Sequence, residues 1–235
     1  MARKLDKALY GPSITEVFFG AVLGLLAGVA VASIYLVFKA VPMVKELPKD
    51  RPRGMVYFIP GLEGKAKGAA WLPKQKQFID GKSVQLVEDE LNAWLATSIK
   101  LDAPPPKPKD GATAPAPAAG APVPDGIFIP SKPNFRIAND RLQLGLNCTL
   151  NWYGVMTDVT LQTTGTFTKQ GDHFVYTPET VYLGSCPLHM LPALSGLLLS
   201  HLTDKVKIPD EFNSAWNKLR DVAITGGTLK LVAAQ

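Results

Sequence analysis

Hydrophobic and polar residues are unevenly distributed along this chain, and one stretch near its start is apolar throughout. Val17 to Phe38 carries no charged residue, and basic residues flank it on both sides. At about 1.5 Å of rise per residue, a helix of this length spans the roughly 30 Å hydrocarbon core of a bilayer. Backbone groups in lipid must bond to one another, so the stretch is predicted to be a transmembrane helix. Residues 1–16 are then a short polar tail, and residues 39–54 form a tether.

Two other interpretations of this stretch are weaker. A cleaved signal peptide is one, because Ala30-Val31-Ala32 has the small-residue spacing of a cleavage site. However, the apolar run continues to Phe38, whereas a cleaved signal turns polar after its cleavage site. A buried helix of a soluble core is the other, but such helices are rarely this long and apolar on every face.

Small residues recur at every fourth position of the predicted anchor, at Gly20, Gly24, Gly28 and Ala32. A stripe of this kind allows a second membrane helix to approach closely. Glycine and alanine are also common in membrane helices in general. The stripe is therefore a candidate helix–helix contact, with another membrane protein or a second copy of the chain as partner.

Residues 55–235 combine helical and strand patterns and predict a single α+β domain. Residues 55–59 are apolar and predict a short strand. The next piece is ambiguous: the spacing of Trp71 and Phe78 places them on one helix face, whereas Pro73 disfavours a helix.

A clear helical pattern covers residues 87–99, in which Leu91, Trp94 and Leu95 contribute to one apolar face. Positions 88–90 are all acidic, and the helix dipole favours negative charge in a first turn. We interpret these acids as interacting with the dipole and with solvent, and not as catalytic groups.

Residues 103–124 consist almost entirely of Ala, Pro, Gly and Lys. Such a segment cannot bury enough apolar surface to order itself. It is predicted to be a disordered loop that interrupts the domain.

Strict period-two alternation follows, with Leu142, Leu144, Leu146, Cys148 and Leu150 separated by polar or small residues. This pattern is typical of a strand with one buried face. Other strands are predicted at residues 127–129, 135–138, 155–168, 173–183, 222–224 and 228–232. The fold class is therefore α+β, in which a curved antiparallel sheet packs on one or two helices behind the transmembrane helix.

A leucine-rich segment, residues 188–202, is apolar but too short and interrupted for a second membrane span. Pro192 fits the first turn of a helix, on which Leu194 and Leu198 share one face. This helix either belongs to the core or lines an apolar groove. A further short helix is predicted from Pro209.

Charge and motifs narrow the function classes. Of the 235 residues, those directly after the anchor contribute to the net charge of +5, and basic residues there suit anionic lipid headgroups. The lysines do not alternate with aromatic residues as in single-strand nucleic-acid binders. Cys148 and Cys186 lack metal-site spacing, and no nucleophile or phosphate-loop motif occurs. We expect no catalysis, metal, cofactor or nucleic-acid partner. The cysteines are interpreted as small buried residues, with a disulfide as the alternative.

The order of elements and two short motifs resemble small single-pass envelope proteins of the tubular lipid-binding and AsmA-like groups, especially the YpmS-like family. One motif is an acidic helix start with a Leu-Asn pair, here Glu88 to Asn92. The other is Gly-x-x-Pro-Leu before a leucine-rich helix, here Gly184, Pro187 and Leu188. The resemblance implies a curved sheet around a long helix, an apolar groove for an acyl chain, and an extracytoplasmic domain on the cell membrane.

Two functions are consistent with these observations. The first is a membrane-anchored, extracytoplasmic, non-catalytic protein that binds a lipid or acyl chain in an apolar groove. The candidate groove residues are Leu91, Trp94, Leu95, Leu194 and Leu198, and ordinary core packing is the alternative role of each. The second is an accessory or structural subunit that docks on a larger membrane complex through its transmembrane helix and its domain. Basic residues on both sides of the anchor leave the orientation open.

Overall fold

A computed structural model describes residues 12–52, 54–62, 70–98, 128–152, 155–191, 194–196, 198, 200 and 209–234. The side chains of residues 95–98, 128, 130, 151, 152 and 155 are also outside the description. The predicted loop at residues 103–124 lies outside the described ranges.

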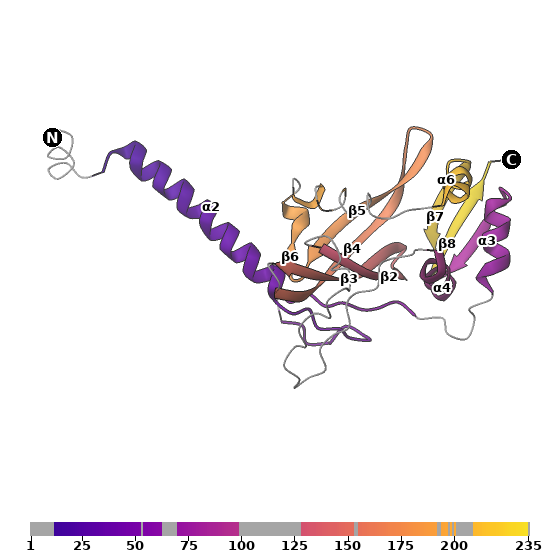
Figure 1. The fold of residues 1–235 in the computed structure, drawn as a ribbon, viewed down its shortest axis with the longest axis horizontal. Helices are drawn as coiled ribbons and strands as arrows, with labels where there is room; N and C mark the ends of the chain where they lie inside the picture. Colours follow the sequence, from indigo (N-terminus) through magenta and orange to yellow (C-terminus); the bar gives the residue numbers. More distant parts are fainter. Residues whose placement is uncertain are drawn as a thin grey trace, which may run out of the picture.

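The long apolar helix α2 (Ile14–Phe38) extends away from the rest of the chain (Figure 1). Within the described ranges it is the one helix long and apolar enough to cross a membrane, and it has no buried residue. It begins before the predicted Val17 because Ser13 and Glu16 form a capping box. The Ser13 hydroxyl accepts a hydrogen bond from the Glu16 backbone N–H, and the Glu16 carboxylate accepts one from the Ser13 N–H, each at 3.2 Å.

A five-stranded antiparallel sheet follows the anchor, with the strands in chain order. Its members are β2 (Phe128–Ala138), β3 (Arg141–Trp152), β4 (Val155–Gln170), β5 (His173–Leu183) and β6 (Cys186–Pro187). The two short strands predicted before residue 139 are one strand, β2, with a register shift between Pro130 and Pro133. The α+β class and the antiparallel pairing are thus confirmed.

Local sequence accounts for the turns and bends of this sheet. Asn139 and Asp140 both have positive φ, 53° and 55°, as the tight turn between β2 and β3 requires. The register of β4 and β5 shifts between Thr164 and Gly165, and Gly165 then faces Pro178. A proline has no N–H to donate to the ladder, which accounts for this irregularity opposite Pro178.

A second, three-stranded sheet lies at the end of the molecule away from the anchor (Figure 1). In spatial order it contains β1 (Val84–Val87), β8 (Thr228–Ala233) and β7 (Leu219–Thr225). The helices α3 (Trp71–Ile79), α4 (Glu88–Ser98) and α6 (Asp210–Trp216) accompany it. The argument from Pro73 against a helix was wrong, because Pro73 lies in the first turn of α3, where its missing N–H leaves no intrahelical bond unmade.

These helices and strands enclose one hydrophobic core together with Ile137, Leu142 and Phe174 of the five-stranded sheet, and we call it the aromatic core. The Phe212 ring lies 5.0 Å from that of Phe78 and 5.1 Å from that of Trp94, measured between centroids. Trp71 and Leu91 are also buried in it. The aromatic core thus closes the end of the molecule that lies away from the anchor.

A separate hydrophobic core lies at the anchor end, and we call it the membrane-side cluster. It consists of Leu146, Cys148, Leu161, Val181, Cys186 and Leu188. Leu146 pairs with Leu161, and Cys148 with Val159, so these strand residues share one face of the sheet, the apolar face. The residues of β3 that alternate with Leu146 and Cys148, such as Gln143 and Gly145, lie on the opposite, polar face.

Helix α4 is attached to β2 by side chains of its first turns. The Asn92 amide donates to the Phe135 carbonyl at 2.7 Å and accepts from the Phe135 N–H at 2.7 Å. The Glu88 carboxylate accepts from the Ile137 N–H at 2.7 Å. Glu90 is buried and forms an ion pair with Lys74. The acids at positions 88 and 90 therefore hold elements together, and the expectation of a solvated role was wrong for Glu90, which is buried. All three acids do lie in the first turn of α4, where the dipole favours negative charge.

Candidate functional site

The end of the anchor docks directly on the apolar face of the five-stranded sheet. Leu36 and Val37 pack against the membrane-side cluster, and the Ser185 N–H donates to the Leu36 carbonyl at 2.9 Å. Gly184 turns at φ 59°, and a Cβ at this position would overlap the Val37 carbonyl oxygen. Only glycine fits there, because both the backbone angle and the close approach exclude a side chain.

Both cysteines belong to the membrane-side cluster, and both are free thiols in agreement with the buried-residue interpretation. Burial raises the pKa of Cys148 to about 12. Burial also raises the pKa of Cys186, and a hydrogen bond with Ser33 of the anchor partly offsets that effect. The neutral thiols are poor nucleophiles and behave as small apolar residues.

The leucine-rich segment that contributes to this cluster also exposes apolar side chains. Met190 is 72% exposed and Leu194 is 53% exposed, although both belong to the leucine-rich segment that also supplies Leu188 and Leu198 to the cluster. Leu188 and Leu198 bring this segment to the membrane-side cluster, against which the end of the anchor also packs. Apolar side chains left in this place are suited to the interface of the membrane that α2 would span.

The candidate groove residues do not lie in one place. Leu91 and Trp94 are buried in the aromatic core, at the end away from the anchor. Leu198 packs on the membrane-side cluster, and Leu194 is mainly exposed. Leu95 lies in α4, and its side chain is outside the described part of the structure.

The polar face of the sheet carries two rows of side chains across neighbouring strands. Strand pairing aligns Arg136, Gln143, Thr164 and Thr180 in one row. In the next row, Gly145 lies between its partners on β2 and β4, and Gln162 pairs with Tyr182. These rows form a hydrophilic floor.

Residues 42–52 and 54–59, which we call the covering segment, follow the anchor and cross this floor. The two ends of the segment are hydrogen-bonded to each other: the Val44 N–H donates to the Phe58 carbonyl at 3.0 Å, and the Phe58 N–H donates to the Pro42 carbonyl at 3.1 Å. The Phe58 ring occupies the space above Gly145, where a Cβ would overlap it. The expected strand at residues 55–59 was wrong, since this segment forms a single isolated bridge, between Phe58 and Met43.

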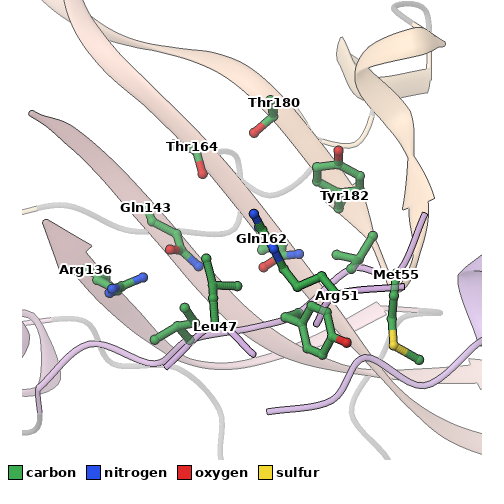
Figure 2. Close-up of a pocket in the computed structure, with 12 residues that line it drawn as sticks. Leu47, Arg51, Met55, Arg136, Gln143, Gln162, Thr164, Thr180 and Tyr182 are labelled. Carbon is green, nitrogen blue, oxygen red and sulfur yellow. The ribbon is translucent and has the colours of Figure 1, made fainter. Parts of the chain in front are cut away.

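A cavity of about 280 Å³ lies between this segment and the polar face (Figure 2). The floor supplies Arg136 and Gln162, and the covering segment supplies Arg51 and Tyr57 together with apolar groups that include Met55. None of the lining residues is acidic.

The two arginines of this cavity form no ion pair with another residue of the described ranges. The ion pairs within the described ranges join Lys74 to Glu90 and Arg141 to Glu179. Arg51 and Arg136 take part in neither, and the Gln162 amide makes no hydrogen bond with another described residue. This site was not predicted from the sequence. The strand alternation indicates the polar face, but no sequence pattern indicates that the tether returns over that face.

The small-residue stripe of the anchor is uncovered. A Cβ added at Gly20, Gly24 or Gly28 would meet nothing within 4 Å, and Ala32 is exposed. Across the described part of the chain, no three His, Cys, Asp or Glu side chains come together as metal ligands do.

Comparison of the chain with protein-family models, with curated proteins and with solved structures finds no match in any of the three. The arrangement itself defines the class of protein: an α+β domain docked on a single candidate membrane-spanning helix.

Proposed function

We propose that this chain is a membrane-anchored, extracytoplasmic, non-catalytic protein that binds an acyl chain of a lipid against the apolar face of its five-stranded sheet. The observation that carries the proposal is the continuity between the anchor and that face. Leu36 and Val37, at the membrane exit of α2, pack against the same cluster as Leu198 of the leucine-rich segment. An acyl chain that leaves the bilayer beside α2 would meet apolar side chains along the whole route.

The apolar face keeps such a chain out of water after it leaves the bilayer. Exposure to water would cost about 0.8 kcal/mol for each acyl CH2 group, and burial against apolar protein surface avoids that cost. Leu150 and Leu183, on the same face, are partly exposed and offer unfilled apolar surface beside the cluster. The resemblance to the YpmS-like family, with its expected groove and extracytoplasmic domain, supports the same proposal.

Photocrosslinking in a bilayer tests this function with the full-length protein. Vesicles would contain a phospholipid with a diazirine near the end of one acyl chain. We expect crosslinks in β3 and β5 peptides around Leu150 and Leu183, in addition to those along α2. Leu198→Trp should reduce the sheet crosslinks, whereas Leu72→Trp, at an exposed position on α3, should not. Crosslinks confined to α2 would contradict the proposal. Protease added to right-side-out vesicles would report whether the domain is extracytoplasmic.

The uncovered stripe on α2 favours a second candidate, an accessory subunit of a larger membrane complex. A helix held to the sheet at Leu36 and Ser185 presents Gly20, Gly24 and Gly28 in a fixed direction relative to the domain. Gly24→Leu should then abolish a co-purifying partner or self-association, because small residues permit the close approach. Ala30→Leu, on another face of the helix, is the matched control. Equal recovery of the partner with both variants would exclude the stripe as the contact.

A further inference from the structure

The cavity on the polar face is separate from the apolar face used in the proposed function. Sheet pairing places Gln162 beside Gly145, whereas the membrane-side cluster uses Leu146 and Leu161, which point to the other side. A ligand in the cavity therefore need not share any contact with an acyl chain on the apolar face.

Three observations make the cavity a binding site for an anion. Arg51 and Arg136 face it from opposite walls, one on the covering segment and one on β2 (Figure 2). None of its described lining residues is acidic, and neither guanidinium forms an ion pair with another described residue. The Gln162 amide lines it and makes no hydrogen bond with a described residue, so its donor and acceptor are available to a polar ligand.

The size and the lining define the ligand further. A volume of about 280 Å³ is at the lower end of small-molecule pockets, which suits a headgroup-sized ligand and not an acyl chain. Two planar guanidinium groups match the charge and the oxygen geometry of a phosphate. Thr164, Thr180 and Tyr182 add hydroxyl groups along the floor, and the Met55 side chain supplies an apolar wall.

We propose that this cavity binds a phosphate monoester, with Arg51 and Arg136 on the phosphoryl oxygens and Gln162 hydrogen-bonded to the ester. The phosphate monoester is either a soluble molecule or the headgroup of an anionic phospholipid. The second source is considered because the covering segment follows the anchor directly in sequence.

The test uses full-length protein in zwitterionic nanodiscs, titrated with glycerol 3-phosphate by isothermal calorimetry. We expect saturable binding that Arg136→Gln and Arg51→Gln each weaken at least tenfold. Lys132→Gln removes a positive charge from an exposed position on the same strand, outside the cavity, and should leave the affinity within twofold. Arg51 is an exposed residue of the covering segment, so its substitution leaves the two hydrophobic cores intact.

A second arm distinguishes the two sources. Nanodiscs that contain phosphatidic acid should compete with glycerol 3-phosphate if the headgroup is the ligand, whereas nanodiscs made equally anionic with oleic acid should not. Equal titrations in the two kinds of nanodisc would assign a soluble ester. The absence of saturable binding in any nanodisc would overturn the proposal. Equal affinities for Arg51→Gln, Arg136→Gln and Lys132→Gln would overturn it as well. Neither result bears on acyl crosslinking to the apolar face, so the two proposals fail independently.

Discussion

Replacing Gly184 with alanine places one methyl group between the anchor and the sheet. Gly184 has φ of 59°, and the added Cβ would overlap the Val37 carbonyl oxygen and approach the Leu36 carbonyl oxygen at 3.0 Å. The obstacle is backbone and not a flexible side chain, so the two segments must move apart. We expect the end of α2 to leave its place on the sheet.

The size of the effect follows from the contacts that hold this junction. A residue other than glycine in the left-handed region costs about 1–2 kcal/mol by itself. The overlap adds roughly 1–3 kcal/mol, as overpacking does in a filled core. Separation also removes the hydrogen bond from Ser185 to Leu36, which contributes about 1 kcal/mol. The contacts specific to the junction thus account for roughly 3 kcal/mol, and since about 1.4 kcal/mol is tenfold, the undocked population should rise about a hundredfold.

Cys186 reports on docking because it is 2% exposed and hydrogen-bonded to Ser33 of the anchor. The rate of its labelling by a maleimide, measured on full-length protein with Cys148→Ala, should increase about a hundredfold in Gly184→Ala. Gly171→Ala is the matched control, because Gly171 has φ of 62° and nothing within 4 Å of an added Cβ. It carries the same backbone cost without the overlap. Equal labelling rates for the two variants would refute the argument that the anchor is docked at this glycine.

Three further predictions concern stability and reactivity. Asn92→Leu removes three hydrogen bonds to Leu62 and Phe135, and thermal melts should show a free energy of unfolding lowered by about 2–4 kcal/mol. The control Asn213→Leu, on the exposed face of α6, should change that free energy by less than about 0.5 kcal/mol. Cys148, whose pKa is raised to about 12, should resist iodoacetamide at pH 9 in native protein and react only with unfolding, as followed by mass spectrometry. Gly145→Ala should expel the overlapping Phe58 ring, which faster proteolysis of the segment around residue 58 would show.

The strand pattern of the sequence was sufficient to predict the sheet. Alternation from Leu142 to Leu150 identified β3 and its buried face, because a period of two has one structural meaning over this length. The anchor was also predicted as a helix, but its start was placed too late, at Val17. The Ser13–Glu16 capping box was legible in the sequence and would have moved the start to the observed Ile14.

Side chains with a tertiary role were harder to predict. Glu88 and Asn92 occupy a first turn in which acids and amides are common for local reasons, and their partners on β2 lie far along the chain. Periodicity assigns a residue to a face of its own element, but it does not say which distant backbone groups that face meets. The same limit explains why Leu91 and Leu198, both on apolar helix faces, lie in different cores.

The polar cavity shows this limit most clearly. Alternation assigned Gln143 and Gly145 to one side of β3, and a solvent-facing role was the natural inference for that side. The structure instead places Phe58 over Gly145, which leaves a covered space beside it. Glycine within a strand can mark close approach of another group, so Gly145 was the signal available in the sequence.

The chain encloses β3 from both faces with segments that are continuous in sequence. Leu36 and Val37 press on the apolar face beside Leu146, and Phe58 presses on the polar face above Gly145, so the anchor and the covering segment hold the sheet between them. The end of α2 and the segment around Phe58 therefore contact β3 from opposite sides. Because those contacts rest on different glycines, Gly184 and Gly145, each can be broken without the other. If Gly184→Ala changes only lipid crosslinking and Gly145→Ala changes only phosphate binding, each face of the sheet has its own function.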